Sequence, residues 1–115
     1  MSDPIPDRPT ADLNLLFGVL ALQMDFVSRD GLVAAMNAWA LAKERPLGQV
    51  LADMGALRDE ERDLLEALVQ KHLRRHGNAE RSLASVSSLR SVRHDLEQIA
   101  DSELQDSLAH VSAAR

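Results

Sequence analysis

Residues 17–27, FGVLALQMDFV, and residues 47–57, LGQVLADMGAL, follow one pattern at an interval of 30 residues. Each stretch opens with a large apolar residue followed by a glycine, and apolar residues then recur at matching positions. The matching positions are Leu20 and Val50, Met24 and Met54, and Val27 and Leu57. Self-similarity at a fixed interval of this size indicates two copies of one small structural unit.

Apolar spacing predicts that each unit is a short helix, a tight turn and a longer amphipathic helix. We expect helices at about 11–25 and 29–43, then a short helix after Pro46 and a longer helix that ends at Gly77. Thr10, Ser28 and Asp59 stand where N-caps belong, and Gly55 and Gly77 are the expected left-handed ends of their helices. In the longer helix of the second unit, the apolar stripe starts about two residues later than in the first. Leu64 and Leu68 therefore correspond to Leu32 and Met36.

The predicted fold class is all-α, with two tandem helix-turn-helix hairpins followed by one or two further helices. Beyond Gly77, apolar spacing predicts helices at about 80–100 and 102–112, the last one capped by Asp101 or Ser102. No stretch alternates with a period of two over the length of a strand. We divide the chain into a disordered leader at 1–9, a tandem-hairpin domain at 10–77, and C-terminal helices or a linker at 78–115 that leads toward a missing downstream domain.

Composition narrows the possible functions. The chain has 115 residues, a net charge of −5, 3% aromatic residues and no cysteine. Disulfide frameworks, thiolate zinc sites and cysteine nucleophiles are therefore excluded, and the negative charge argues against binding to nucleic acid. The most apolar stretch is only about a dozen residues long, whereas a membrane span needs about 20. We expect a cytoplasmic protein with no nucleic-acid or membrane partner.

The stretch LNLLFGVLALQMDFVSRDGLVAAMNAWALAKERPLGQVLADMGALRDEERDLLEALVQKHLRRHG, residues 13–77, resembles a region that precedes the catalytic domain in planctomycete-type bacterial serine/threonine protein kinases. Residues 82–111, SLASVSSLRSVRHDLEQIADSELQDSLAHV, resemble the continuation of that region. The resemblance implies a non-catalytic regulatory or protein-interaction region of a signalling kinase. Its partner would be another protein or its own kinase domain, and a homodimer is a further expectation.

Each unit also resembles the helical N-terminal domain of type II secretion and type IV pilus ATPases, in which a motif of arginine, leucine and glycine precedes spaced leucines. Here Arg45, Leu47 and Gly48 match the motif, with Pro46 standing between the arginine and the leucine. Some members of that family bind cyclic di-GMP through tandem copies. The resemblance therefore implies an alternative function, a cyclic-dinucleotide sensor with a ligand site at these three residues.

Catalytic chemistry is not expected in this chain. The five glycines are isolated, so there is no glycine-rich phosphate loop, and the kinase catalytic motifs are missing. His72 and His76 have a spacing that can chelate a metal, but the residues between them include two arginines, and we expect no metal and no cofactor. Trp39 and Phe17 are expected in the core.

Two polar features are candidates for interaction. The basic residues Lys71, Arg74, Arg75 and Arg81 could hold an anion or an acidic partner, although the pattern favours a solvated helix end followed by a linker. The serines at 82–91 stand beside arginines and could be phosphorylated, or could form the polar face of a helix. The helix at 11–25 is apolar on most sides, which predicts a central position in the core or an oligomer interface.

Overall fold

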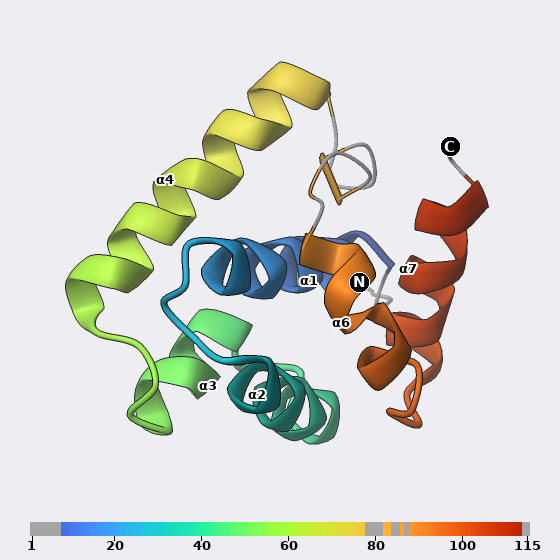
Figure 1. The fold of residues 1–115 in the computed structure, drawn as a ribbon, viewed down its shortest axis with the longest axis horizontal. Coiled ribbons are helices and arrows are strands. Elements are labelled where there is room, and N and C mark those ends of the chain that lie inside the picture. Colours follow the sequence, from blue (N-terminus) through green and yellow to red (C-terminus); the bar gives the residue numbers. More distant parts are fainter. Residues whose placement is uncertain (1–7, 78–81, 84–85, 87, 114–115) are drawn as a thin grey trace, which may run out of the picture.

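Helices are the only regular elements in the part of the chain that the computed structural model describes, residues 8–77, 82–83, 86 and 88–113 (Figure 1). The prediction of an all-α fold is confirmed. The helices are α1 (Arg8–Gln23), α2 (Arg29–Leu41), α3 (Leu47–Asp53), α4 (Asp59–His76), α6 (Ser88–Leu96) and α7 (Ser102–Ala113).

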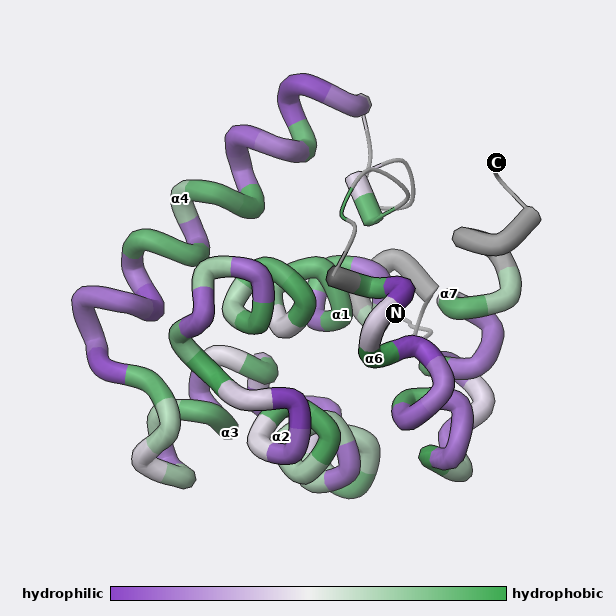
Figure 2. Tube along the Cα trace, in the orientation of Figure 1, coloured by the Kyte–Doolittle hydropathy of each residue, from purple (hydrophilic) through white to green (hydrophobic). Residues whose placement is uncertain are grey.

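Helix α1 is the centre of the fold. It packs against α2, α3, α4, α6 and α7, and Figure 2 shows the hydrophobic colour on most of its length. This position explains why α1 is apolar on most sides, because each side faces another helix. Its buried apolar side chains are those of Ala11, Leu15, Leu16, Phe17, Val19, Leu20 and Ala21.

The 30-residue repeat is visible in the backbone. The first helices of the two units end at Gln23 and Asp53, and the second helices begin at Arg29 and Asp59. The turns between them close with the same hydrogen bonds, displaced by 30 residues, for example Phe26 N–H to the carbonyl of Ala21 and Ala56 N–H to that of Leu51, each 2.9 Å.

Both turns also need one residue with a left-handed backbone. Asp25 has a φ of 66° and Gly55, 30 residues later, has a φ of 76°. Glycine adopts this conformation without a steric penalty, and aspartate is one of the few other residues that tolerate it. The predicted left-handed ends at Gly55 and Gly77 are both confirmed, and Gly77 has a φ of 95°.

The two apolar-glycine pairs that open the units interlock. A Cβ atom built on Gly18 would lie 2.6 Å from Leu32 Cδ1 and 2.7 Å from Leu47 Cδ2. A Cβ atom built on Gly48 would lie 2.9 Å from Phe17 Cζ. The apolar residue of each pair therefore occupies the space that a side chain on the other glycine would need. The contact is reciprocal, as in two copies related by an approximate twofold axis.

The packing of whole helices follows the same approximate symmetry. Exchanging the two units turns the contact between α1 and α4 into the contact between α3 and α2, and both contacts are extensive. The two hairpins therefore cross-pack, with the longer helix of each against the shorter helix of the other. This arrangement buries apolar faces that neither hairpin covers alone.

The C-terminal helices complete the same core. Helix α7 packs on α1, and α6 packs on α1 and α2. Three of their fully buried side chains, Leu96, Leu104 and Leu108, join one hydrophobic cluster with the residues of the two hairpins. The segments before and after Gly77 therefore share one core in this structure. A downstream domain stays a prediction.

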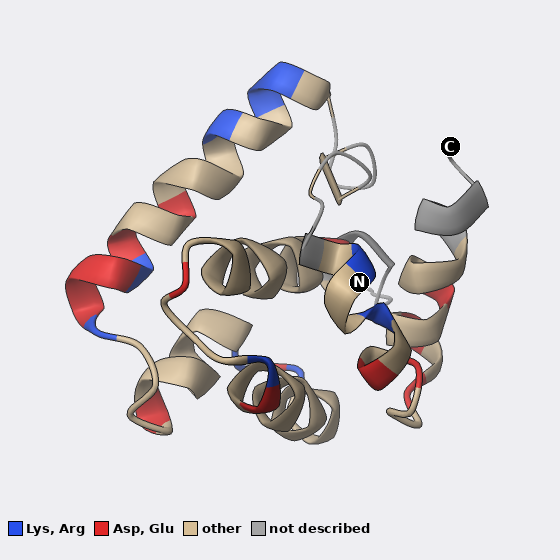
Figure 3. Cartoon of the chain, viewed as in Figure 1, with Lys and Arg blue, Asp and Glu red and all other residues tan. Residues whose placement is uncertain are grey.

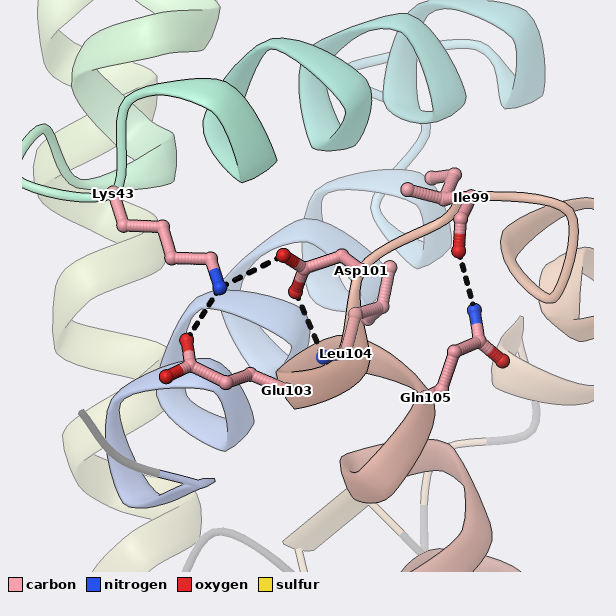
Figure 4. A network of polar contacts seen from close by, with 6 residues as sticks. All are labelled: Lys43, Ile99, Asp101, Glu103, Leu104 and Gln105. Atoms are coloured by element: carbon pink, nitrogen blue, oxygen red, sulfur yellow. Dashed lines mark hydrogen bonds and ion pairs between the residues drawn. The ribbon is translucent and has the colours of Figure 1, made fainter. Parts of the chain in front are cut away.

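A polar clasp at Lys43 joins the first hairpin to the C-terminal helices (Figure 4). The Lys43 Nζ atom lies 2.7 Å from Asp101 Oδ1 and 2.6 Å from Glu103 Oε1. The other carboxylate oxygen of Asp101 accepts the Leu104 N–H at 3.0 Å, so Asp101 is the N-cap of α7, as predicted. The ammonium group also lies 5.5 Å from the centroid of the Trp39 ring, within range of a cation–π contact.

Several helix boundaries differ from the predicted ones. Helix α1 begins at Arg8, two residues before the expected cap Thr10, because proline is compatible with the first turn of a helix. The rest of the expected leader, residues 1–7, lies outside the described residues. Ser28 caps α2 as predicted and accepts the Gly31 N–H at 3.0 Å. Helix α4 begins at Asp59, which is therefore not its cap, and Glu61 accepts the Arg58 N–H at 3.0 Å.

The predicted helix at 80–100 is not continuous in the structure, because Val86 is not helical and α6 (Ser88–Leu96) ends four residues early. Residues 80–81, 84–85 and 87 lie outside the described residues. Beyond the end of α6, Gln105 Nε2 donates to the carbonyl of Leu96 at 3.1 Å and to that of Ile99 at 2.8 Å, and Figure 4 shows the bond to Ile99. Helix α2 ends at Leu41, so Lys43 lies beyond the helix.

The predicted stripe on α4 was wrong at one position, since Leu64 is 46% exposed. The buried residues of α4 are Leu65 and Val69. They correspond to Ala35 and Trp39 at the same 30-residue interval. The other buried residues of α2, Leu32 and Met36, correspond to Arg62 and Glu66, so the buried stripe of the second unit does begin later along its helix.

Alanine at Gly18 tests the interlock. The substitution adds helix propensity worth about 1 kcal/mol, but overpacking against Leu32 and Leu47 costs about 1–3 kcal/mol because both are fully buried. We expect Gly18→Ala to lower the free energy of unfolding in urea. The control is Gly31→Ala, where the new Cβ meets only Ser28 Oγ at 3.1 Å and the effect should be near zero. If Gly18→Ala is as stable as Gly31→Ala, the close contact is wrong.

The clasp predicts a loss of stability at alkaline pH. Burial lowers the pKa of Lys43, but hydrogen bonds to Asp101 and Glu103 and their charges together outweigh it and raise the pKa above 10.5. The stabilisation is therefore complete below pH 10.5 and disappears as the pH rises through the raised pKa. Lys43→Met should cost about 1 kcal/mol at pH 7 and almost nothing near about pH 12.

The amino-acid composition makes the loss of stability at alkaline pH specific to Lys43. The chain has no tyrosine or cysteine, and Lys71 is its only other lysine. Lys71→Met, at an exposed position of α4, serves as the control for removing a lysine outside the clasp. A cost of Lys43→Met that is the same at both pH values would contradict the clasp.

Candidate functional site

A cavity of about 260 Å³ lies between the two units, bounded by α1, the start of α3 and α4. Phe17 and Val69 form most of its apolar floor, and Leu13, which is 40% exposed, lies at its edge. Glu66 is the single charged residue among those that line it. The full lining consists of Leu13, Asn14, Phe17, Pro46, Gly48, Glu66, Val69 and Gln70.

The cavity exists because the two units are unequal at two positions. In α2, which packs against α3, Met36 and Trp39 are fully buried. Thirty residues later, α4 has the exposed Glu66 and the smaller Val69. A charged residue stays toward solvent, and valine leaves the volume of an indole ring unfilled. The cavity is therefore the place that Trp39 occupies in the other half of the approximate symmetry.

The cavity also borders a cap that the sequence analysis missed. Asn14 Oδ1 accepts the Leu47 N–H at 2.7 Å, so a side chain of α1 caps the first turn of α3. Pro46, at the N-cap position, forms no cap hydrogen bond through its own side chain. Because the two residues are 33 positions apart, no local sequence signal could have identified the pair. The bond fixes the start of α3 and hence one wall of the cavity.

The three predicted ligand residues are separated in the structure. Gly48 lines the cavity, but Leu47 is fully buried against Gly18 and cannot be reached by a ligand. Arg45 forms an ion pair with Asp53 at the other end of α3 and does not line the cavity. Among the residues that line it, none is positively charged.

The predicted basic patch lies at the end of α4. Lys71, Arg74 and Arg75 are exposed there, whereas Arg81 lies outside the described residues. Figure 3 shows the acidic residues of α4 at its start and these basic residues at its end. This order is the one that the helix dipole favours.

His72 and His76 lie beside the basic patch, and their rings stack with centroids 5.7 Å apart. Burial is the main reason that the pKa of His72 lies below 6.5, and the charges of His76, Arg75 and Lys71 lower it further. The neutral imidazole is thus favoured in the folded chain, and its contribution to stability is lost as the pH falls below 6.5. In the described part of the chain, no group of three or more potential ligands could hold a metal ion.

Of the remaining candidates, Trp39 and Phe17 are structural, whereas Ser91 of the serine-rich segment is exposed on α6 and stays a candidate for phosphorylation. Trp39 is fully buried and Phe17 nearly so, which confirms that both belong to the core. In the serine-rich segment, Ser82 is fully buried and donates to the His72 carbonyl at 3.0 Å, so it is inaccessible to a kinase in the folded chain. The serines at 85 and 87 lie outside the described residues. No described helix combines the length and apolar character of a membrane span.

Comparisons with protein-family models, with curated protein sequences and with solved structures found no match to this chain.

Proposed function

We propose that this chain is a non-catalytic regulatory and protein-interaction region of a bacterial serine/threonine protein kinase, acting in the cytoplasm. The resemblance of residues 13–111 to the segments that precede such kinase domains supports the class. The cavity between the units carries the interaction. It would accept an apolar side chain from a partner protein or from the kinase domain itself.

Size and charge favour a protein partner in the cavity. Its volume of about 260 Å³ lies just below the range of about 300–1,000 Å³ that is typical of small-molecule pockets. It suits one large anchor side chain, of the kind that dominates binding at helix grooves. The partner's flanking residues should be basic, because Glu66 is the charged group at the rim and α4 begins with Asp59, Glu60 and Glu61.

The alternative of a cyclic-dinucleotide sensor gains no support from the geometry. Its two phosphates would face Glu66 and no cation among the lining residues, and Arg45 is already paired with Asp53. It stays a prediction that titration calorimetry with cyclic di-GMP can test, with Arg45→Ala as the companion variant.

The first unit suggests the substitution that tests the cavity in the second unit. Val69→Trp places in α4 the side chain that α2 has at Trp39, and it should fill the cavity without unfolding the chain. The gene is first sequenced beyond the codon for Arg115. If a kinase domain follows, its kcat/KM on a generic protein substrate is measured for the intact protein and for Val69→Trp, and we expect a change of at least about threefold.

Leu41→Trp is the matched control, because Leu41 is 90% exposed at the end of α2 and is not among the lining residues. It should leave the kinase activity unchanged, and thermal unfolding should show that both variants stay folded. A downstream sequence without a kinase domain would overturn the proposed class. Equal activity of Val69→Trp and the unchanged protein would overturn the role of the cavity.

A further inference from the structure

The outer side of α4 differs from the outer sides of the other helices in being both partly apolar and segregated in charge. Only Leu65 and Val69 are buried among its 18 residues, and Figure 1 shows α4 along the outside of the molecule. Leu64 is 46% exposed, and Leu68 is only partly covered by the core. Burial of two leucines in water-exposed positions would be favourable, so this side is suited to a partner.

Helical periodicity places a continuous row on this side of α4. Positions separated by three or four residues share one face of a helix. The row consists of Glu60, Leu64, Ala67, Leu68, Lys71 and Arg75, all exposed apart from the half-buried Leu68. It is acidic at its start, apolar in its middle and basic at its end. Within the described part of the chain, neither Glu60 nor Arg75 forms an ion pair.

We propose that this row, the α4 stripe, binds the same stripe of a second copy of this chain in an antiparallel arrangement. A twofold axis between Ala67 and Leu68 brings the start of one helix to the end of the other. Glu60 then lies opposite the second copy's Arg75, and Leu64 packs on the second copy's Lys71 stem. At the centre, the small side chain of Ala67 lets the two helices approach each other.

Charge selects the second copy and its direction. A parallel pair would place acid against acid at one end and base against base at the other. In an antiparallel pair, the acidic start of one helix faces the basic end of the other at both ends of the interface, because a twofold axis repeats each contact. The helix dipole explains the order of charges along α4 but not the exposed Leu64 between them.

The size of the contact sets the expected strength. Helix α4 is about 27 Å long at about 1.5 Å per residue, so a pair of such helices buries less than the roughly 1,200–2,000 Å² of a standard stable interface. We therefore expect a weak dimer with a dissociation constant in the micromolar range. Because surface charges contribute, the constant should rise with salt.

Sedimentation equilibrium of the whole 115-residue chain tests the dimer, over about 1–500 μM protein at about 50 mM and about 500 mM salt. We expect a monomer–dimer equilibrium that weakens at high salt. Leu64→Lys should raise the dissociation constant at least about tenfold, because it places a second cation against the second copy's Lys71, whereas the matched control Leu41→Lys should not change it. A chain that is monomeric at every concentration, or a dimer that survives Leu64→Lys, would overturn the proposal.

A charge exchange tests the antiparallel direction. Arg75→Glu places two acidic residues opposite each other at both ends and should abolish the dimer. Adding Glu60→Arg to the same chain restores opposite charges in the antiparallel pair and should restore the dimer. Circular dichroism checks that each variant keeps its helices, because both changes oppose the helix dipole. If the folded double variant stays monomeric, the antiparallel direction is wrong.

The dimer goes beyond the proposed function and does not depend on a kinase domain. Val69→Trp changes the cavity on the inner side of α4 and should leave the dimer intact, whereas Leu64→Lys should leave the cavity intact. The experiments can therefore refute the role of the cavity and the dimer independently of each other.

Discussion

The arrangement of the helices depends on the absence of side chains at Gly18 and Gly48. Phe17 lies against Gly48, and Leu47 lies against Gly18, so the first helices of the two units approach each other more closely than any larger residue would allow. This contact sets the approximate twofold axis between the hairpins. From it follow the cross-packing of α1 with α4 and of α2 with α3, and the central position of α1.

Both proposed binding surfaces lie where the two units differ from each other. The C-terminal helix α6 covers α2, and the Lys43 clasp closes over Trp39 on that side. On the other side, Val69 and Glu66 leave a cavity, and the row from Glu60 to Arg75 stays open to solvent. One half of the duplication therefore serves mainly stability, while the other presents two surfaces that can bind partners. Both proposals rest on this division.

Local signals in the sequence were sufficient for the repeat, the helical fold and several caps, because apolar spacing, Ser28, Asp101, Gly55 and Gly77 act within a few residues. The rest depends on long-range contacts. The Asn14 cap on Leu47 and the bonds from Lys43 to Asp101 and Glu103 join distant segments and leave no local pattern. The exposure of Leu64 follows from which hairpin the C-terminal helices cover. Strict comparison of α4 with α2 at the 30-residue interval would have identified Val69 opposite Trp39.

The most direct test of the interlock is a double-mutant cycle between Phe17 and Gly48. A Cβ atom at position 48 would meet Phe17 Cζ at 2.9 Å and Cε1 at 3.3 Å, and leucine at position 17 lacks both atoms. We expect Gly48→Ala to cost about 1–3 kcal/mol of unfolding free energy in the native chain and much less in a Phe17→Leu chain. Equal costs in the two chains would mean that the residues are not coupled, which would contradict the contact that sets the packing of the two hairpins.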